Sequence, residues 1–438
     1  MQDAVLLSGV TLPTGQTADV LVQGETISAV AAPGSLDPPA AQRLDLHGYL
    51  VLPAPAEPHG HLDKALTAGR LANPAGDLDG AVQAWCAYRP TMEHDDVVRR
   101  ATTAALTQLA NGVTAIRSHV DVGPDIGLRS LEAVAEVREA LRGQVELQLV
   151  ALPMLPLTGE AGRPNAALLR AAMEAGADVV GGCPYRDDDP TASQELCLEL
   201  AAELGRPLDL HSDECLDPAV LNLPQLAELV SSSRFPHGVA ASHCCSLGVQ
   251  PAEVAKRVAA ELAAAGVGVI SCPQTNLFLQ ARGHASAPPR GLTALRALLD
   301  AGVLVAAGGD NLQDPFNTVG RGDPLEIASL LVAAGHLSPE EAYRAVSASS
   351  RAVMGLPEVR VEAGFPAELL AIRAASVQEA VATASPERVV VHQGRVVART
   401  ALSRELPLRV EAPAAAGQPA VAGQPAVAGR PAGSGSLS

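Results

Sequence analysis

Residues 51–61 read VLPAPAEPHGH, a short apolar run that ends in two histidines separated by one glycine. Seven more short apolar runs follow it, at 112–121, 145–153, 177–184, 207–214, 238–245, 266–273 and 303–310. Helix-like segments lie between these runs. Strands that alternate with helices predict a parallel sheet with crossover helices. Eight such units is the number at which an α/β barrel closes. The sequence therefore predicts an α/β fold, a (β/α)8 TIM-like barrel over 53–360.

The segments between the runs have the apolar period of helices. They are 95–110, 127–142, 165–175, 191–204, 250–265 and 291–301, with two more at 324–334 and 338–352. Ser338 and Glu341 stand three residues apart, at the positions of a capping box, and so mark the start of the last helix.

The two ends of the chain have a different pattern. Residues 1–52 and 361–410 consist of short β-branched runs separated by Gly, Pro and Asp turns. We therefore predict a small composite β-sandwich built from both termini. The final stretch, 411–438, repeats Ala, Gly and Pro with little to bury, and we expect it to be disordered.

Composition excludes several classes of protein. Hydrophobic residues make up 47% of the chain but aromatic residues only 2%, so the core must consist mainly of Ala, Val and Leu. The net charge of −17 argues against nucleic-acid or anionic-membrane partners. The seven cysteines form no C-x-x-C pair, and no signal peptide or apolar run of roughly 18 residues is visible. We expect a cytoplasmic homo-oligomer that acts on a small molecule.

Metal-binding residue types lie at the ends of the predicted strands. His59 and His61 end the first strand, and residues two apart in a strand point the same way. His211 ends the fifth strand, His243 the sixth and Asp310 the eighth. The C-terminal strand ends of such a barrel share one face, which carries the active site. These side chains therefore predict one metal site, with Glu57 nearby in the sequence.

Imidazoles with one carboxylate suit zinc or ferrous iron and leave a position for water. Such an ion lowers the pKa of bound water to roughly 7. A carboxylate must then accept the water proton, and Glu214 lies just past His211. Asp310 can hold the ion and orient the water. His243 is either a ligand or a group that polarises the attacked atom.

Residues 50–355 resemble the bacterial cytosine deaminase branch of the amidohydrolase superfamily. The motifs that carry this resemblance are EPHGHLDKALTAG (57–69), RSHVDVG (117–123), GADVVGGCPY (176–185), LDLHSDE (208–214), ASHCCS (241–246) and GGDNLQDPF (308–316). The resemblance implies one iron or zinc ion on His59, His61, His211 and Asp310. It also implies Glu214 as proton shuttle and His243 as a contact of the attacking hydroxide.

Three residues depart from the cytosine deaminase pattern, and they concern the substrate. Met154 stands where a glutamine is expected, Asn311 where a second aspartate is common, and Phe316 where an indole is common. A thioether cannot replace the paired donor and acceptor of an amide. HLDK (61–64) is similar to relatives that act on N-alkyl triazines, and Lys64 is a candidate charged contact. We therefore expect a substrate other than cytosine.

Other residues have weaker indications. His119 and Asp121 end the second strand as candidate orienting groups. Cys183 and Cys272 are expected to pack as free thiols. Candidate substrate contacts or packing residues are Trp85, Tyr88, Gln274 and Asn276.

Three functions remain in competition. The first is hydrolytic deamination of an amino-substituted heterocycle such as a pyrimidine or triazine. The second is hydrolysis of a cyclic or linear amide C–N bond by the same site. The third, a catalytically silent scaffold, requires a lost site residue, and His59, His61, His211, Glu214 and Asp310 are all present.

Overall fold

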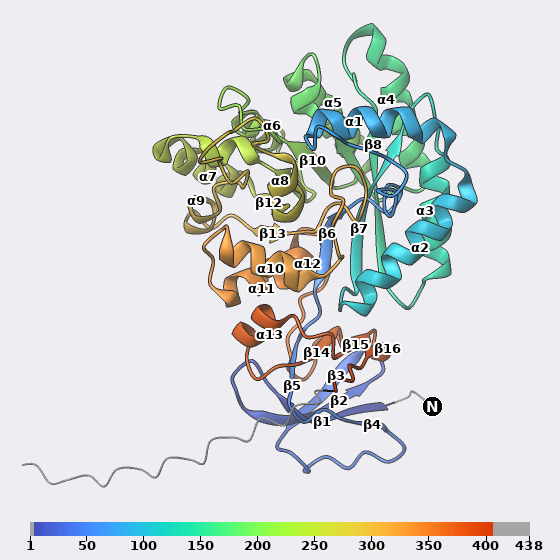
Figure 1. The fold of residues 1–438 in the computed structure, drawn as a ribbon, viewed down its shortest axis with the longest axis vertical. Coiled ribbons are helices and arrows are strands. Elements are labelled where there is room, and N and C mark those ends of the chain that lie inside the picture. Colours follow the sequence, from blue (N-terminus) through green and yellow to red (C-terminus); the bar gives the residue numbers. More distant parts are fainter. Residues whose placement is uncertain (1–3, 406–438) are drawn as a thin grey trace, which may run out of the picture. The chain divides into compact units, whose positions relative to one another are not determined.

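The computed structural model describes residues 4–405 and contains two eight-stranded sheets (Figure 1). One sheet is entirely parallel and comes from the middle of the chain. The other is mixed and comes from both ends. The tail at 411–438, for which we expected disorder, lies outside the described residues.

The parallel sheet is the predicted barrel. Its strands lie side by side in chain order, from β6 to β13. They are β6 (Ala56–Gly60), β7 (Ala115–Val122), β8 (Glu146–Pro153), β9 (Val179–Gly182), β10 (Leu208–Ser212), β11 (Val239–His243), β12 (Val267–Ser271) and β13 (Val305–Ala307). A parallel bridge between Gly60 and Asp310 brings the first and last strands together. The predicted eight-stranded α/β barrel is thereby confirmed.

Helices surround this sheet in Figure 1. Those that the sequence predicted are α2 (His94–Ala110), α3 (Arg129–Ala140), α4 (Gly159–Glu174), α5 (Pro190–Leu204), α7 (Ala252–Ala265), α9 (Leu295–Asp300), α10 (Pro324–Ala333), α11 (Pro339–Val346) and α12 (Ala348–Val353). The Ser338–Glu341 capping box is present at the start of α11. The predicted last helix, 338–352, is two helices, because the backbone leaves the helical region at Ser347.

Four helices were not expected. They are α1 (Leu78–Tyr88), α6 (Leu223–Ser233), α8 (Pro273–Leu279) and α13 (Val377–Thr383). The last corrects the expectation of strands alone near the C-terminus, and Ser376 caps it by accepting from the N–H of Glu379. The Asp77 side chain caps α1 in the same way by accepting from the N–H of Gly80.

The mixed sheet joins the two ends of the chain, as predicted. Its strands are β1 (Ala4–Thr11), β2 (Thr17–Gln23), β3 (Thr26–Ala31), β4 (Gln42–Asp45), β5 (Tyr49–Pro53), β14 (Leu369–Arg373), β15 (Arg388–His392) and β16 (Arg395–Thr400). Strand β14 pairs antiparallel with β5 and so connects the C-terminal strands to the N-terminal ones. Valines and leucines on one face form an apolar cluster separate from the barrel core.

The run VLPAPAEPHGH is divided between the two sheets. Its first residues belong to β5, and its last belong to β6. Pro53 and Pro55 lie at the division, and a proline has no N–H to donate to a sheet. The chain therefore leaves the mixed sheet here and starts the barrel strand that carries His59.

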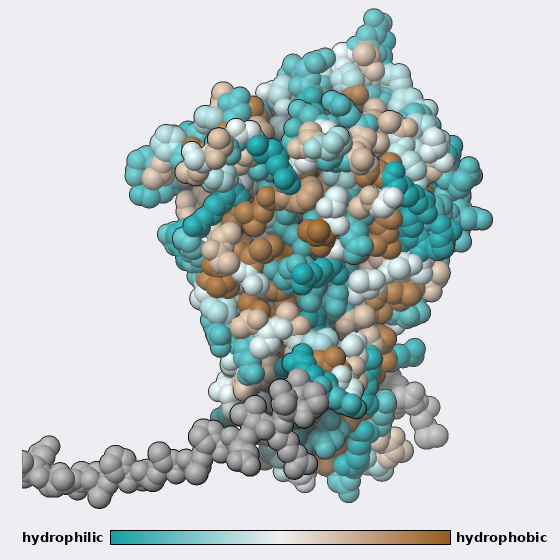
Figure 2. Space-filling model, viewed as in Figure 1, coloured by the Kyte–Doolittle hydropathy of each residue, from teal (hydrophilic) through white to brown (hydrophobic). Residues whose placement is uncertain are grey.

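The molecular surface seen in this view carries both hydrophilic and hydrophobic residues. Figure 2 shows hydrophilic residues around the rim and hydrophobic residues gathered near the centre. Among residues 4–405, no helix has both the length and the apolar character that a membrane crossing requires.

Candidate metal centre

Three histidines and one aspartate from three strand ends converge in the barrel. The Nε2 atom of His211, on β10, lies 3.2 Å from Nε2 of His59 and 3.4 Å from Nε2 of His61. Oδ1 of Asp310 lies 3.2 Å from Nε2 of His61 and 4.0 Å from Nε2 of His59. All four residues are buried. The structure thus brings together the four residues predicted as metal ligands.

The chemistry of these donor atoms fits a divalent cation. Tetrahedral ligands with zinc–nitrogen bonds of 2.0–2.1 Å lie about 3.3 Å apart, close to the separations seen here. Burial lowers the pKa of His59 and His211 far below the usual value, so both imidazoles are neutral. Oδ1 of Asp310 is buried without a hydrogen-bond partner among the described residues. Nitrogen and oxygen atoms that face one another in this way fit a divalent cation between them.

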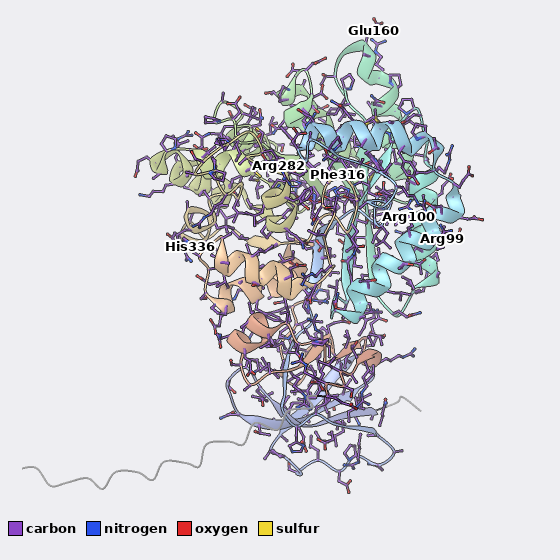
Figure 3. All side chains as sticks on the ribbon, in the orientation of Figure 1. Arg99, Arg100, Glu160, Arg282, Phe316 and His336 are labelled. Atoms are coloured by element: carbon purple, nitrogen blue, oxygen red, sulfur yellow. The ribbon has the colours of Figure 1, made fainter. Side chains whose placement is uncertain are left out.

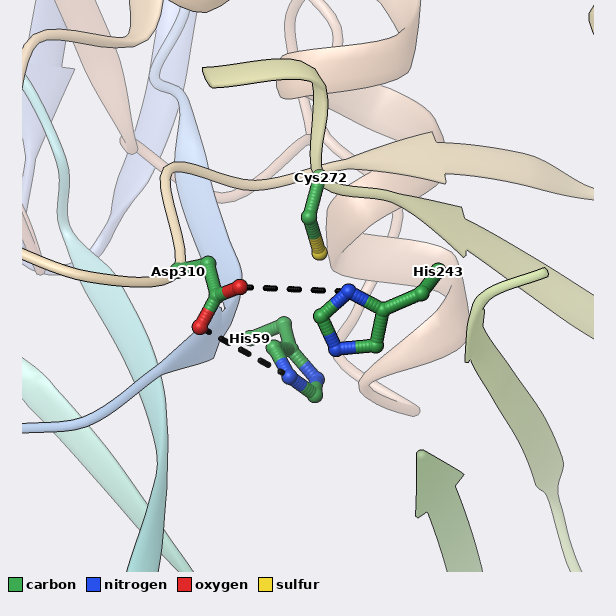
Figure 4. Close-up of side chains that lie close together, drawn as sticks. All are labelled: His59, His243, Cys272 and Asp310. Atoms are coloured by element: carbon green, nitrogen blue, oxygen red, sulfur yellow. Dashed lines mark ion pairs between the residues drawn. The ribbon is translucent and has the colours of Figure 1, made fainter. Parts of the chain in front are cut away.

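His243 and Cys272 lie beside this cluster (Figure 4). Nδ1 of His243 is 3.9 Å from Oδ2 of Asp310, the oxygen that does not face His61. Ligand atoms of His59, His243, Cys272 and Asp310 all lie within 4.8 Å of one another. Burial raises the pKa of Cys272 well above its usual value, which keeps the group a thiol. Cys272 therefore lies within ligand distance of the cluster, and its expected role as a packing thiol stays a prediction.

His119 is buried against the metal histidines. Its ring centroid is 4.0 Å from that of His59, and its nitrogens have no hydrogen-bond partner among the described residues. His59, His119 and His211 form a second group whose ligand atoms lie within 4.8 Å of one another. His119 therefore packs against the rings of His59 and His211, with its Nε2 3.6 Å from Oδ1 of Asp209, and its role as an orienting group stays a prediction.

Glu214 is buried next to these residues. Nδ2 of Asn276 donates to its Oε1 at 3.3 Å, and Nδ1 of His243 is 3.4 Å from the same oxygen. The Tyr185 hydroxyl lies 3.5 Å from Oε2. Burial, with a contribution from the charge of Asp310, raises the pKa of Glu214 to about 8. A carboxyl group with such a pKa can accept and release a proton near neutral pH.

Glu57 does not face the metal cluster. Its carboxylate accepts the backbone N–H of His59 at 3.0 Å and that of Gly309 at 2.7 Å. A Cβ on Gly308 would stand 2.2 Å from Oε1 of Glu57, so a larger residue there must displace the carboxylate. Glu57 therefore holds the strand of His59 against the loop of Asp310.

A cavity of about 360 Å³ opens beside the cluster. His61, His211, Glu214, His243 and Asp310 form its metal-side wall. All four predicted substrate residues also line it: Lys64, Met154, Asn311 and Phe316. Phe316 lies near the centre of the view in Figure 3. The four residues therefore surround one cavity, and their contact with a substrate stays a prediction.

Two of these wall residues are held by neighbours. Nδ2 of Asn311 donates to Asp314 at 2.9 Å, and its Oδ1 accepts from Thr275 at 3.3 Å. Nζ of Lys64 lies 2.6 Å from Oδ1 of Asp121 and 3.2 Å from Nδ1 of His61. The amide of Asn311 is thus occupied by Asp314 and Thr275, whereas Lys64 connects the cavity wall to His61, a predicted metal ligand.

Part of the cavity wall was not predicted. Leu78, Val82, Arg89, Tyr185 and Arg186 all line it. Tyr185 and Arg186 belong to the short 3-10 helix Pro184–Arg186 that follows β9, and their place just past a strand end is a signal that identifies them in retrospect. The residues of α1 and Arg89 have no such signal.

Of the residues with weaker indications in the sequence, some lie at the cavity or beside Glu214 and others do not. Trp85 and Cys183 line the cavity, and Asn276 contacts Glu214. Tyr88 and Gln274 are absent from the lining. The Tyr88 hydroxyl instead accepts a hydrogen bond from Arg70.

Comparisons with known proteins agree with this geometry. A family model described as "Amidohydrolase family" matches residues 75–398. The chain is 33% identical over 405 residues to a pterin deaminase of Rhizobium rhizogenes, covering 91% of this chain and 92% of the relative. The prediction of a hydrolase that acts on C–N bonds is confirmed.

Solved structures give the same result. The 5-methylcytosine deaminase of Klebsiella pneumoniae, liganded with phosphonocytosine, superposes with a TM-score of 0.83 at 29% identity, covering 93% of this chain and all (100%) of that one. The N-isopropylammelide isopropylaminohydrolase of Burkholderia multivorans superposes with a TM-score of 0.79 at 30% identity, covering 91% and 99%.

Proposed function

Because the chain belongs to the amidohydrolase family, we propose that it hydrolytically deaminates an amino-substituted nitrogen heterocycle, with a pterin as the first candidate substrate. The observation that carries this proposal is the position of Glu214. It is a buried carboxyl group with a raised pKa, beside a three-histidine, one-aspartate cluster and in the wall of a cavity.

His59, His61, His211 and Asp310 would hold one divalent ion, zinc or iron. When bound, such an ion supplies hydroxide as a nucleophile near neutral pH. The neutral imidazoles donate lone pairs and Asp310 supplies the compensating negative charge. These residues thereby fix the place of the reaction at the metal-side wall of the cavity.

Glu214 carries the proton in this scheme. Its carboxylate accepts a proton from the nucleophile, and its carboxylic acid then donates that proton to the departing amino group. Asn276 holds the carboxyl group in place, since its amide donates to Oε1 and also contacts Nδ1 of His243. His243 stands beside the same oxygen and can donate a hydrogen bond to the attacked ring.

The remaining wall supports a ring larger or more apolar than cytosine. Met154 offers no paired donor and acceptor, and the amide of Asn311 is occupied by Asp314 and Thr275. Leu78, Val82 and Trp85 add apolar surface from α1. A cavity of about 360 Å³ accommodates a fused bicyclic ring.

The test is a substrate panel on the purified protein with zinc or iron restored. Pterin, 5-methylcytosine, N-isopropylammelide and cytosine are each assayed for released ammonia or amine and for the oxo product. We expect pterin to have the highest kcat/KM and cytosine the lowest. Release of a carboxylate from amide substrates, with no ammonia from the ring panel, would favour amide hydrolysis instead.

A further inference from the structure

Three cavity-wall side chains from two segments meet on one buried carboxylate, that of Asp121 on β7. Nζ of Lys64 donates to its Oδ1 at 2.6 Å. Nε1 of Trp85, on α1, donates to its Oδ2 at 2.7 Å. NH1 of Arg89, which follows α1, donates to Oδ2 at 3.3 Å. Lys64, Trp85, Arg89 and Asp121 all line the cavity.

From this arrangement we infer that Asp121 is a positioning residue for the substrate, because it fixes α1 as the roof of the cavity and Lys64 as its charged wall. This role rests on the proposed function, since it takes the cavity as the place where the heterocycle binds.

Helix α1, the roof of the cavity, depends on polar contacts because few of its side chains are buried. Helix α1 is an insertion after β6 rather than one of the helices that alternate with the barrel strands. Only Ala81 and Trp85 are buried among its residues. Hydrogen bonds from Trp85 and Arg89 to Asp121 therefore tie both the helix and its C-terminal end to the barrel.

The neighbouring charges keep the Asp121 carboxylate ionised. We call Asp121 with its contacts to Lys64, Trp85 and Arg89 the clamp. Although burial opposes it, the Lys64 ammonium and the Arg89 guanidinium lower the pKa of Asp121 to about 2. Hydrogen bonds to an ionised acceptor are roughly twice as strong as neutral ones. Nζ of Lys64 also lies 5.4 Å from the centroid of the Trp85 ring, so the wall and the roof contact each other directly.

Asp121→Asn keeps the shape of the side chain and removes its charge and one acceptor. We expect KM for the fastest panel substrate to rise about tenfold to a hundredfold, with a smaller change in kcat and full metal content. Trp85→Phe breaks the same contact from the helix side and should also raise KM. The two changes should be less than additive when combined, because they remove one interaction.

Asp125→Asn is the matched control. Asp125 pairs with the same guanidinium, at 2.7 Å from Nε of Arg89, but it is partly exposed and does not line the cavity. We expect its KM to stay near the wild-type value. An equal rise in KM in both variants, or additive effects of Asp121→Asn and Trp85→Phe, would overturn the role of Asp121.

Trp85 also provides a readout that needs no substrate. It is the one tryptophan of the chain and is only 2% exposed. In Asp121→Asn we expect acrylamide to quench its fluorescence severalfold more strongly, whereas Asp125→Asn should match the wild type. If Asp121→Asn shows stronger quenching but the wild-type protein turns over no panel substrate, the clamp is retained and the proposed function is rejected. Normal turnover with unchanged quenching and KM would reject the clamp. If Asp121→Asn does not fold, the KM of Trp85→Phe decides.

Discussion

Glu57 on the first barrel strand accepts the backbone N–H of Gly309, just past the last strand, at 2.7 Å. The same carboxylate accepts the N–H of His59. This buried side chain therefore adds to the Gly60–Asp310 bridge in joining the first and last strands, and it links the backbones that carry His59 and Asp310. The geometry of the predicted metal ligands and the closure of the barrel thus share one interaction.

The first prediction concerns Gly308→Ala. Its added Cβ would lie 2.2 Å from Oε1 of Glu57, so the carboxylate must move and weaken its two hydrogen bonds. We expect the free energy of unfolding to fall by about 1–3 kcal/mol. Thermal and denaturant melts measure this, with Gly283→Ala as control because no atom lies within 4 Å of its added Cβ. Equal stability of the two variants would contradict the role of Glu57.

The second prediction concerns removal of the metal. Dialysis against a chelator should abolish turnover and lower the melting temperature, because it leaves several buried, unpaired donor atoms in one place. Returning zinc or ferrous iron should restore both. His61→Ala should bind less than the roughly one equivalent expected for the wild type by elemental analysis. His284→Ala, at an exposed position, should bind the full amount. Full activity in metal-free protein would contradict the site.

Glu214→Gln is the third test. The amide retains the size of the side chain but cannot carry the proton, so kcat should fall about 10²–10⁴-fold. Metal content and melting temperature should remain near the wild-type values, since Glu214 is not a predicted ligand. Glu228→Gln changes an exposed carboxylate on α6 and should leave kcat unchanged. Near-normal turnover by the Glu214 variant would show that another group carries the proton.

The fourth prediction concerns substrate choice at Met154. Met154→Gln introduces a donor and an acceptor into the cavity wall, so kcat/KM for cytosine should rise relative to the preferred substrate by about tenfold or more. Met154→Leu keeps the wall apolar with nearly the same volume and should preserve the original preference. Parallel assays with cytosine and pterin give the ratio. An unchanged ratio in both variants would remove Met154 from the specificity of the site.

Much of the barrel and of its metal cluster could be predicted because both follow from local patterns. The apolar runs mark the strands, and His59, His211 and Asp310 stand where those runs end. Since parallel strands share one face, residues far apart in sequence could be grouped without knowledge of contacts.

The roof of the cavity could not be predicted in this way. Helix α1 is positioned by side-chain contacts with Asp121, which lies 36 residues from Trp85 in the sequence. Neither the apolar periodicity of the sequence nor the spacing of its motifs indicates a side-chain contact of this kind. Helix α13 was missed for a related reason, because its short segment between strands is stabilised by the Ser376 cap and by packing against the barrel helices.

The pairing of β5 with β14 has a consequence for synthesis on the ribosome. As the nascent chain emerges, β5 meets β1 only through Leu50 and Thr11, and its main partner is encoded more than three hundred residues later. The edge of β5 that faces β14 therefore remains without its hydrogen-bond partners until residues 369–373 have emerged. Premature termination anywhere before Leu369 leaves that edge open to association with other chains.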